Sequence, residues 1–405
     1  MNVLGIVAEY NPFHNGHLHH IKQSKELSNS DAVVCVISGN FVQRGNPSLV
    51  DKWTKAKMAL TNGADLVIEL PTIYSVSSAE NFAEGAIKLL NSLNIVNTIS
   101  FGSECGEIEI LDNIASILYN EPSEYVTMLN HELQLGTSFP KAREKALLLY
   151  LNDIRRYANI LSAPNNILGI EYLKAIKKYK LPLFPMTIKR EKELTSTMTN
   201  SSTVRKYVAE NKFDNIKSAV PANIRPIIQD KIEKGEILPD LQMFEKEILY
   251  QLRKMSTEEI ARIPDVNEGL ENTIKSAANS CNNLYDLISL VKSKRYTLTR
   301  IQRILTYVLL NITKEDMENA RKLKQPYIRV LGFTSRGEEL LSQICSDPKS
   351  KLPVITSVKH FTDINTNKIL KRMLEIDIFA TNIYTLGYQY NSTANLDFTQ
   401  EIIKI

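Results

Sequence analysis

Short apolar runs alternate with longer amphipathic segments over roughly the first half of this 405-residue chain. The short runs are rich in Val, Ile and Leu and are bounded by Gly, Asn, Asp or Pro, which is typical of buried strands. This pattern predicts a parallel sheet with helices on both faces, which is a Rossmann-like α/β fold. We expect strands at Val3–Glu9, Ala32–Ser38, Leu66–Leu70, Thr98–Gly102 and Leu183–Ile188, and helices at Gly16–Leu27, Lys52–Thr61, Ala79–Leu93 and from about Ser202.

The pattern changes after Lys212. Helical periodicity then dominates, and two short apolar runs return near the end of the chain. The helical segments include Phe244–Met255, Leu270–Val291 and Thr299–Asn311, and the late runs are Ile328–Phe333 and Val354–Val358. We therefore expect an α/β domain at 1–212 and a mostly helical region at 213–405 that ends in a small α/β part.

Composition narrows the class of protein. Hydrophobic residues make up 43% of the chain and charged residues 23%, which argues against wholesale disorder. The formal net charge of +4 permits an RNA partner without requiring one. Cys35, Cys105, Cys281 and Cys345 show no paired spacing, so we expect free thiols in a reducing compartment. Because no apolar run is long enough for a membrane span, we expect a cytoplasmic protein that does not contact a membrane.

Four of the six histidines fall between residues 14 and 20, just after the first expected strand. Ligands bind at the carboxyl ends of the strands in an open parallel sheet, and a helix N-terminus there attracts phosphate. Gly16 permits close backbone approach, and the imidazoles of His14 and His17 can donate to phosphate oxygens. Read by itself, the segment is also compatible with a histidine-rich surface turn or an opportunistic metal site.

A second motif lies at the start of the helix expected from about Ser202. The hydroxyls of Ser202 and Thr203 and the guanidinium of Arg205 are donors that could hold a second phosphate group there. The alternative is a serine-rich helix cap followed by an exposed arginine.

These motifs resemble two signatures of the nucleotidyltransferase superfamily. His14-Asn15-Gly16-His17 is similar to HxGH, and Ser201-Ser202-Thr203-Val204-Arg205 is similar to ISSTxxR, with Asn200 where an apolar residue is usual. Longer strings resemble the tRNA(Met) cytidine acetate ligases: Val7–His17, Ser38–Gly45, Asp65–Pro71, Phe101–Glu104 and Pro164–Gly169. The resemblance covers essentially the full length and implies a HUP-type nucleotidyltransferase domain with a parallel sheet.

The resemblance also implies an activity. Members of the family convert acetate and ATP to acetyl-adenylate and then acetylate N4 of the wobble cytidine of elongator tRNA(Met). It therefore implies ATP as a substrate, Mg²⁺ accompanying the ATP, and acetate and elongator tRNA(Met) as partners. No obligate protein partner is inferred. The residues alone indicate none of these identities, and no carboxylate cluster suggests metal ligands.

The ATP site implied by the resemblance combines the Val7–His20 segment with three distant residues. His14 and His17 would be catalytic, stabilising charge at the α-phosphate. The whole set is Val7, Ala8, Glu9, Tyr10, Asn11, Pro12, Phe13, His14, Asn15, Gly16, His17, Leu18, His19, His20, Gly102, Asn165 and Arg190.

The residues themselves leave other roles open for four members of this set. His19 and His20 lie outside the signature, and a solvated helix face is the expected place for both. Asn165 is also compatible with a helix N-cap, and Arg190 with a solvated strand end. Gly102 ends a strand, where a side chain would block the adenine or ribose.

A run of twelve residues from Lys292 to Arg303 contains no acid. Such a face can bind RNA phosphates, and Tyr296 within it can stack on a base. We expect RNA contacts from Arg44, on the loop after the second strand, and from Lys292, Lys294, Arg295, Arg300 and Arg303. A second basic cluster is Arg321, Lys322, Lys324 and Arg329. The alternative for both clusters is an ordinary solvated charged face.

Two other functions compete with the ligase. One is an adenylyltransferase acting on a small phosphorylated acceptor, although such an enzyme needs little beyond the first domain. The other is a non-catalytic RNA-binding protein that retains an ATP site. The ligase hypothesis requires no protein nucleophile, because positioning and electrostatics supply most of the catalysis in phosphoryl chemistry.

Overall fold

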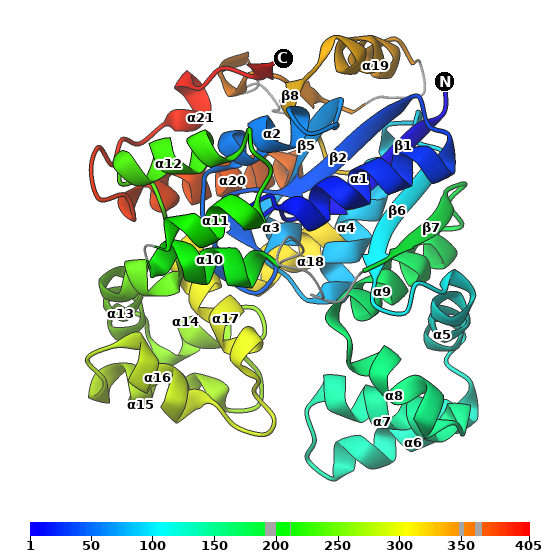
Figure 1. Ribbon diagram of the computed structural model, residues 1–405. Coiled ribbons are helices and arrows are strands. Elements are labelled where there is room, and N and C mark those ends of the chain that lie inside the picture. Colours follow the sequence, from blue (N-terminus) through cyan, green and yellow to red (C-terminus); the bar gives the residue numbers. More distant parts are fainter. Residues whose placement is uncertain (191–199, 211, 348–351, 361–366) are drawn as a thin grey trace.

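One sheet runs through the centre of the protein and contains strands from both ends of the chain (Figure 1). The computed structural model describes residues 1–190, 200–210, 212–347, 352–360 and 367–405. The strands follow the order β10-β8-β5-β2-β1-β6-β7, and β9 pairs with β8. Their bounds are β1 Val3–Ala8, β2 Ala32–Ser38, β5 Leu66–Leu70, β6 Thr98–Ser103, β7 Phe184–Lys189, β8 Ile328–Phe333, β9 Val354–Ile355 and β10 Ile403–Lys404; a separate hairpin consists of β3 Phe41–Val42 and β4 Asn46–Pro47.

The central strand β1 lies between β2 and β6 and is parallel to both. From β1 the chain moves outwards through β2 to β5, and then returns to the other side of β1 for β6 and β7. The direction of the crossovers therefore reverses at β1 and β6. In an open α/β sheet, the crevice at such a switch point is where ligands bind.

The strand β2 shows why the sheet is covered on both sides. All seven of its residues are buried. Val34 and Val36 pack into one hydrophobic core with Phe82 of α4, whereas Val33 and Cys35 belong to a second core on the opposite face. A strand buried on both faces reads as one continuous apolar run, which is how the sequence identified it.

Helices cover both faces of the sheet in the N-terminal part. Those of the second core include α1 and α2, and those of the first include α4 and α9. Their bounds are α1 Asn15–Ser28, α2 Lys52–Leu60, α3 Thr72–Ser75, α4 Ala79–Ser92, α5 Ile108–Asn120, α9 Pro164–Tyr179 and α10 Ser201–Ala209.

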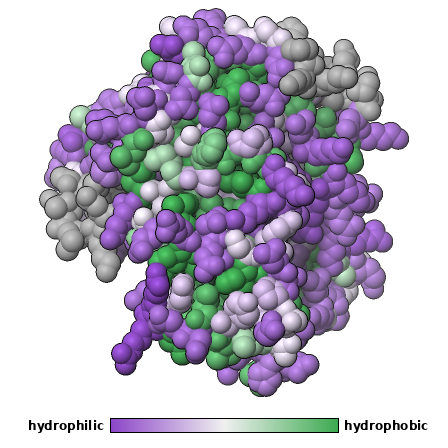
Figure 2. All heavy atoms as spheres, turned by 90° about the vertical axis from the view of Figure 1, so that its right-hand side faces the viewer, coloured by the Kyte–Doolittle hydropathy of each residue, from purple (hydrophilic) through white to green (hydrophobic). Residues whose placement is uncertain are grey.

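Two helical groups extend from the same end of the sheet (Figure 1). The first is inserted between β6 and β7 and consists of α6 Ser123–Gln134, α7 Phe139–Leu151 and α8 Ile154–Ser162. The second, α13 to α17, belongs to the C-terminal half. Hydrophobic and hydrophilic residues are interleaved on the side of the molecule where β7 and the first group lie (Figure 2). The helices of the C-terminal half are α11 Phe213–Ala219, α12 Arg225–Glu233, η1 Leu241–Phe244, α13 Glu245–Lys254, α14 Thr257–Ala261, α15 Leu270–Ser280, α16 Leu284–Val291, α17 Leu298–Leu310 and α18 Lys314–Lys322.

The last part of the chain returns to the sheet. The strand β8 pairs antiparallel with β5, and β10 pairs parallel with β8. The late apolar runs expected as a small α/β end thus extend the N-terminal sheet and form no separate unit. The division at 212 stays a prediction. The elements between and after these strands are α19 Ser335–Ser346, η2 Val358–His360, α20 Lys368–Leu386 and α21 Leu396–Thr399.

The predicted strands and helices agree closely with those of the structure, with one clear difference. β2, β5 and β8 have the predicted bounds. The periodic segment Leu270–Val291 is two helices, however, because Cys281 is extended and Asn283 begins α16 by accepting from the N–H of Asp286. Among the described residues, no helix is long and apolar enough to cross a membrane.

Candidate active site

A cavity of about 1060 Å³ opens at the carboxyl ends of β1 and β6. Its position is the switch point of the sheet, and its lining brings together segments that are far apart in the sequence. Of the predicted site residues, the lining includes Val7, Ala8, Glu9, Tyr10, Asn11, His14, Gly16, His17, His19, His20, Arg44, Gly102, Asn165, Arg190, Ser202 and Arg205.

Several predicted residues of the same motifs support the cavity from outside. Phe13 is fully buried in the second core. Asn15 points away and donates through Nδ2 to the carbonyl of Ser218 at 2.8 Å. The Thr203 N–H donates to the side chain of Asn200 at 2.9 Å, so it serves the cap of α10. Pro12 and Leu18 also lie outside the lining.

His14 and His17 cap the N-terminus of α1 reciprocally. The Gly16 N–H donates to Nδ1 of His14 at 3.0 Å, and the His14 N–H donates to Nδ1 of His17 at 3.3 Å. The two rings are stacked with their centroids 3.7 Å apart. Because Nδ1 is the acceptor in each ring, a neutral imidazole must carry its hydrogen on Nε2. Each ring can therefore donate one N–H from the atom opposite the cap.

Burial keeps both imidazoles neutral. Desolvation lowers the pKa of His14 to about 3, and the Arg190 guanidinium contributes in the same direction. The pKa of His17 is also well below its usual value, because of burial first and then the neighbouring His14 and Arg190. At neutral pH the pair therefore acts through N–H donors, and the positive field of the site comes from Arg190 and the α1 N-terminus.

His20 is not on a solvated helix face, so that expectation was wrong. Its Nε2 lies 3.2 Å from the hydroxyl of Ser100, which is 2.7 Å from the hydroxyl of Ser24. Burial lowers the pKa of His20 to about 4. Because α1 runs along the sheet, its fifth and sixth residues face the cavity, and His19 also belongs to the lining.

The second motif joins the first directly. Asn200 caps α10, and Nη1 of Arg205, one turn into that helix, donates to the carbonyl of Asn11 at 2.8 Å. The hydroxyl of Ser201 donates to the carbonyl of Pro12 at 3.3 Å. Asn200 stands where the ISSTxxR signature usually has an apolar residue. The structure gives a reason for this difference, because the Asn200 side chain accepts a helix N–H that an apolar residue would leave unpaired.

Gly102, Asn165 and Arg190 lie around the end of β6. A Cβ atom at Gly102 would approach Cγ of Arg190 to 3.3 Å, so glycine leaves room for this arginine beside the strand end. Asn165 is inside the first turn of α9 and is not its N-cap, which is Ala163. Its Nδ2 donates to Oε1 of Glu104 at 2.7 Å.

Glu104 also lines the cavity, although the sequence analysis did not single it out. Its Oε2 accepts from the N–H of Asn166 at 2.9 Å, and in return Oδ1 of Asn166 accepts from the N–H of Glu104 at 2.8 Å. The carboxylate therefore orients Asn165 while binding the positive N-terminus of α9. An acid directly after β6, in a string that resembled the family, was the available signal.

The chain as a whole is similar to known proteins. A family model described as HIGH Nucleotidyl Transferase matches residues 1–398. The tRNA(Met) cytidine acetate ligase of Thermoanaerobacter sp. (strain X514) is 46% identical over 412 residues, covering 100% of both chains. The one of Acetivibrio thermocellus is 42% identical over 416 residues, with the same coverage. The chain belongs to the tRNA(Met) cytidine acetate ligase family.

Two solved structures of the family match the fold of this chain. Thermotoga maritima TmcAL bound with alpha-thio ATP matches with a TM-score of 0.93 and 33% identity, and its apo form matches with a TM-score of 0.94 and 32% identity. Each match covers 100% of both chains. The resemblance inferred from the motifs and the α/β nucleotidyltransferase fold are thereby confirmed. The roles of individual residues stay predictions.

The helical C-terminal half contributes to the same cavity. Pro239, Asp240, Thr299 and Gln302 belong to the lining. Gly45 makes this junction possible: a Cβ atom there would lie 2.4 Å from the backbone nitrogen of Arg303 in α17, and its φ is +73°. Neither the periodicity nor the spacing of the motifs indicated that α17 would pack against the loop after β3.

The basic run before and within α17 is only partly available to a ligand. Arg300 donates to the carbonyl of Asp265 at 2.6 Å and 3.0 Å, and Arg303 pairs with the carboxylate of Asp265 at 3.0 Å. Arg295 pairs with Glu268 at 2.7 Å. The run contains no acid, but the loop that carries Asp265 and Glu268 supplies acids in space. Lys292 and Lys294 are the exposed cations that remain for RNA, and contact with RNA stays a prediction.

The second basic cluster is not a continuous surface either. Arg329 is buried and pairs with Asp397 at 2.7 Å, and Arg321 donates to Oδ1 of Asn81 at 3.2 Å. Within the described residues, no group of three or more His, Cys, Asp or Glu side chains is arranged to hold a metal ion.

The capping geometry predicts the protonation of the two histidines. Imidazole ¹⁵N–¹H correlation spectra of the folded protein should show His14 and His17 as neutral rings protonated on Nε2, unchanged between about pH 5 and pH 8. Protonation of His14 should begin only towards pH values of about 3. In the protein unfolded by urea, the same rings should titrate with a pKa of about 6.5. A folded-state transition of either ring near that value would contradict the capping geometry.

Proposed function

We propose that this protein activates acetate with ATP and transfers the acetyl group to N4 of the wobble cytidine of elongator tRNA(Met). The observation that carries the proposal is the joining of both signature motifs at one cavity, through the 2.8 Å hydrogen bond between Arg205 and the carbonyl of Asn11. The names of full-length relatives at 42–46% identity support the acid and the tRNA.

In the first step, an acetate oxygen attacks the α-phosphorus of ATP. The new O–P bond replaces the bond to the bridging oxygen, and pyrophosphate leaves. Nε2–H groups of His14 and His17 stabilise the charge that develops on the α-phosphate oxygens, and Arg205 and Ser202 hold the pyrophosphate. Because these donors are fixed by the α1 cap and the α10 cap before substrate binds, little reorganisation accompanies the step.

In the second step, N4 of cytidine attacks the carbonyl carbon of acetyl-adenylate. The C–N bond forms, the C–O bond to the phosphate breaks, and AMP leaves as N4 loses a proton. The acceptor would approach from the side of the cavity where Arg44, Asp240 and Gln302 meet, because α17 joins the nucleotide site there. Mg²⁺ would accompany ATP and neutralise part of the charge on its phosphates, and we assign no described residue as its ligand.

The role of the histidine pair can be tested by substitution. His14→Ala and His17→Ala should each lower acetate-dependent exchange of labelled pyrophosphate into ATP by ~100-fold or more, as expected for the loss of one preorganised donor. His131→Ala, an exposed histidine of α6, is the matched control and should exchange normally. Near-normal rates in both His14→Ala and His17→Ala would show that the α-phosphate lies elsewhere.

The identity of the acid can be tested with the same exchange reaction and no tRNA. We expect exchange with acetate and weaker exchange with propionate, because one misfitting methylene costs about 1–3 kcal/mol in a small pocket. Arg205→Ala should abolish both. A plain adenylyltransferase would instead require its phosphorylated acceptor, and an RNA-binding protein would show no exchange. Absence of acetate-stimulated exchange, together with tRNA lacking acetylcytidine after incubation with ATP and acetate, overturns the ligase.

Charge reversal tests the RNA surface. Lys292→Glu with Lys294→Glu should weaken tRNA binding and flatten its dependence on salt, because fewer counterions are released. Lys368→Glu with Lys371→Glu makes the same charge change on exposed positions of α20 and is the control. Exchange without tRNA should be normal in both. Equal tRNA affinity of the two double variants across a salt titration would exclude the Lys292–Lys294 surface.

A further inference from the structure

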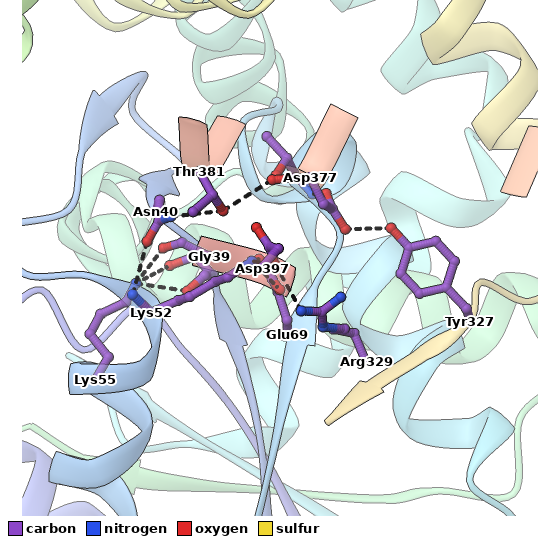
Figure 3. Close-up of polar contacts among 12 residues, drawn as sticks. Gly39, Asn40, Lys52, Lys55, Glu69, Tyr327, Arg329, Asp377, Thr381 and Asp397 are labelled. Carbon is purple, nitrogen blue, oxygen red and sulfur yellow. Dashed lines mark hydrogen bonds and ion pairs between the residues drawn. The ribbon is translucent and has the colours of Figure 1, made fainter. Parts of the chain in front are cut away.

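A buried lysine outside the cavity lining contacts the ends of two strands, and Figure 3 shows its contact with Gly39. Lys55 of α2 is 0% exposed, and its Nζ donates to the carbonyls of Ser38 at 2.7 Å, Gly39 at 2.7 Å and Glu9 at 3.2 Å. The hydroxyl of Ser38 is a fourth oxygen near Nζ, at 3.3 Å, so the three N–H groups of an ammonium all have oxygen acceptors. Ser38 ends β2, and Glu9 directly follows β1, so one side chain connects the two strand ends.

The strand ends held by Lys55 lead directly into the site. Glu9 begins the segment that continues to His14 and His17, and it lines the cavity. Its Oε1 accepts from the N–H of Gln43 at 2.8 Å, on the loop between β3 and β4. Lys55 itself is outside the cavity lining. Its contacts therefore act on the position of the walls and not on a bound nucleotide.

The segment on the other side of Lys55 is fixed by neighbouring elements. A Cβ atom at Gly39 would lie 2.4 Å from Oε1 of Glu69, so the backbone there is pressed against β5. Asn40 accepts from the N–H of Lys52 at 2.9 Å and donates to the hydroxyl of Thr381 in α20 at 3.1 Å. With residues 38–40 held in place, the ammonium positions the end of β1 against a rigid support.

We propose that Lys55 is a positioning residue for catalysis, whose ammonium holds the ends of β1 and β2 so that His14 and His17 meet the α-phosphate. The proposal rests on the proposed function. A displacement of reacting groups by about 1 Å can cost on the order of 100-fold in rate, so a support behind the wall has a kinetic effect without touching substrate.

The charge state of Lys55 supplies an independent test. Burial lowers its pKa to about 7, opposed by the carboxylates of Glu9 after β1, Glu69 in β5 and Asp51 before α2, whereas Lys52 in α2 acts with burial. The ammonium form provides an N–H for each carbonyl. Loss of its proton turns a lone pair towards one of them, so the support should weaken as the pH rises through this pKa.

The first experiment is Lys55→Met, which keeps the length of the chain and removes the donors. At a temperature where the variant is folded by circular dichroism, kcat for acetate-dependent pyrophosphate exchange should fall about 10- to 100-fold, with the KM for ATP changed by less than about 3-fold. The matched control is Lys88→Met. Lys88 is a buried lysine of α4 that donates to the carbonyl of Leu323 at 3.2 Å, outside the cavity lining. It should lower Tm and leave kcat unchanged.

A fall in Tm with unchanged kcat in Lys55→Met, as in Lys88→Met, overturns the positioning role. If Lys55→Met does not fold, the pH profile decides: kcat/KM of the unmodified protein should decline from about pH 7 to about pH 9, and Lys55→Arg should lack that decline. A flat profile of the unmodified protein overturns the proposal. If the unmodified protein shows no exchange, the proposed function fails instead. For the positioning role to stand in that case, Lys55→Met must shift the imidazole ¹⁵N–¹H correlations of His14 and His17, and Lys88→Met must leave them in place.

Discussion

The imidazoles of His14 and His17 have two tasks in the first turn of α1: each accepts a backbone N–H that caps the helix, and each carries an N–H of its own on the opposite side. A helix N-terminus leaves N–H groups without partners, and a side chain that accepts one of them contributes about 1 kcal/mol. His14 and His17 satisfy that requirement through Nδ1, at 3.0 Å and 3.3 Å. The cap therefore also sets the tautomer, because the hydrogen of each neutral ring must lie on Nε2. Serine would cap the helix equally well, but it has no second nitrogen from which an N–H could point to the opposite side.

The cap is useful only because the sheet brings other segments to it. β1 is flanked by parallel neighbours on both sides, and the crossovers reverse direction there. Arg190 directly follows β7. Arg205 lies in α10 and donates to the carbonyl of Asn11. A histidine pair that is neutral at pH 7 needs cations nearby to stabilise an anion. The topology supplies them from positions far along the chain.

How much was predictable from the sequence depended on the range of the interactions involved. β2, β5 and β8 are buried on both faces, so their apolar runs marked their bounds. The two motifs were recognisable because their chemistry is local. The break at Cys281–Asn283 was missed although Asn283 is a capping residue, because the apolar periodicity continues across it. The ion pairs of the basic run were not predictable for a different reason: Asp265, which binds Arg300 and Arg303, lies about three dozen residues earlier on a separate loop.

Interactions with the end of the chain were beyond any local pattern. Lys52 is fully buried in α2 and pairs with Glu69 at 2.9 Å and with Asp397 at 2.8 Å (Figure 3). Asp397 also binds Arg329 in β8. Nothing in the sequence near Lys52 shows that an acid 345 positions away is its partner. Lys52 is thus the centre of a buried ion network, a place where lysine is rarely found.

This network explains why the C-terminal half is not an appendage of a nucleotide-binding domain. Removing one partner from a buried ion pair leaves an uncompensated charge and costs about 3–5 kcal/mol, a large part of the stability of a typical domain. β8 and β10 extend the sheet on the side of β5, and α20 contacts Asn40 and, through Asp377, the N–H of Thr72. The loops next to the cavity are thus supported by the last part of the chain. A protein whose acceptor is an RNA needs its two substrate surfaces in a fixed relation, and a shared sheet and a shared buried network provide it.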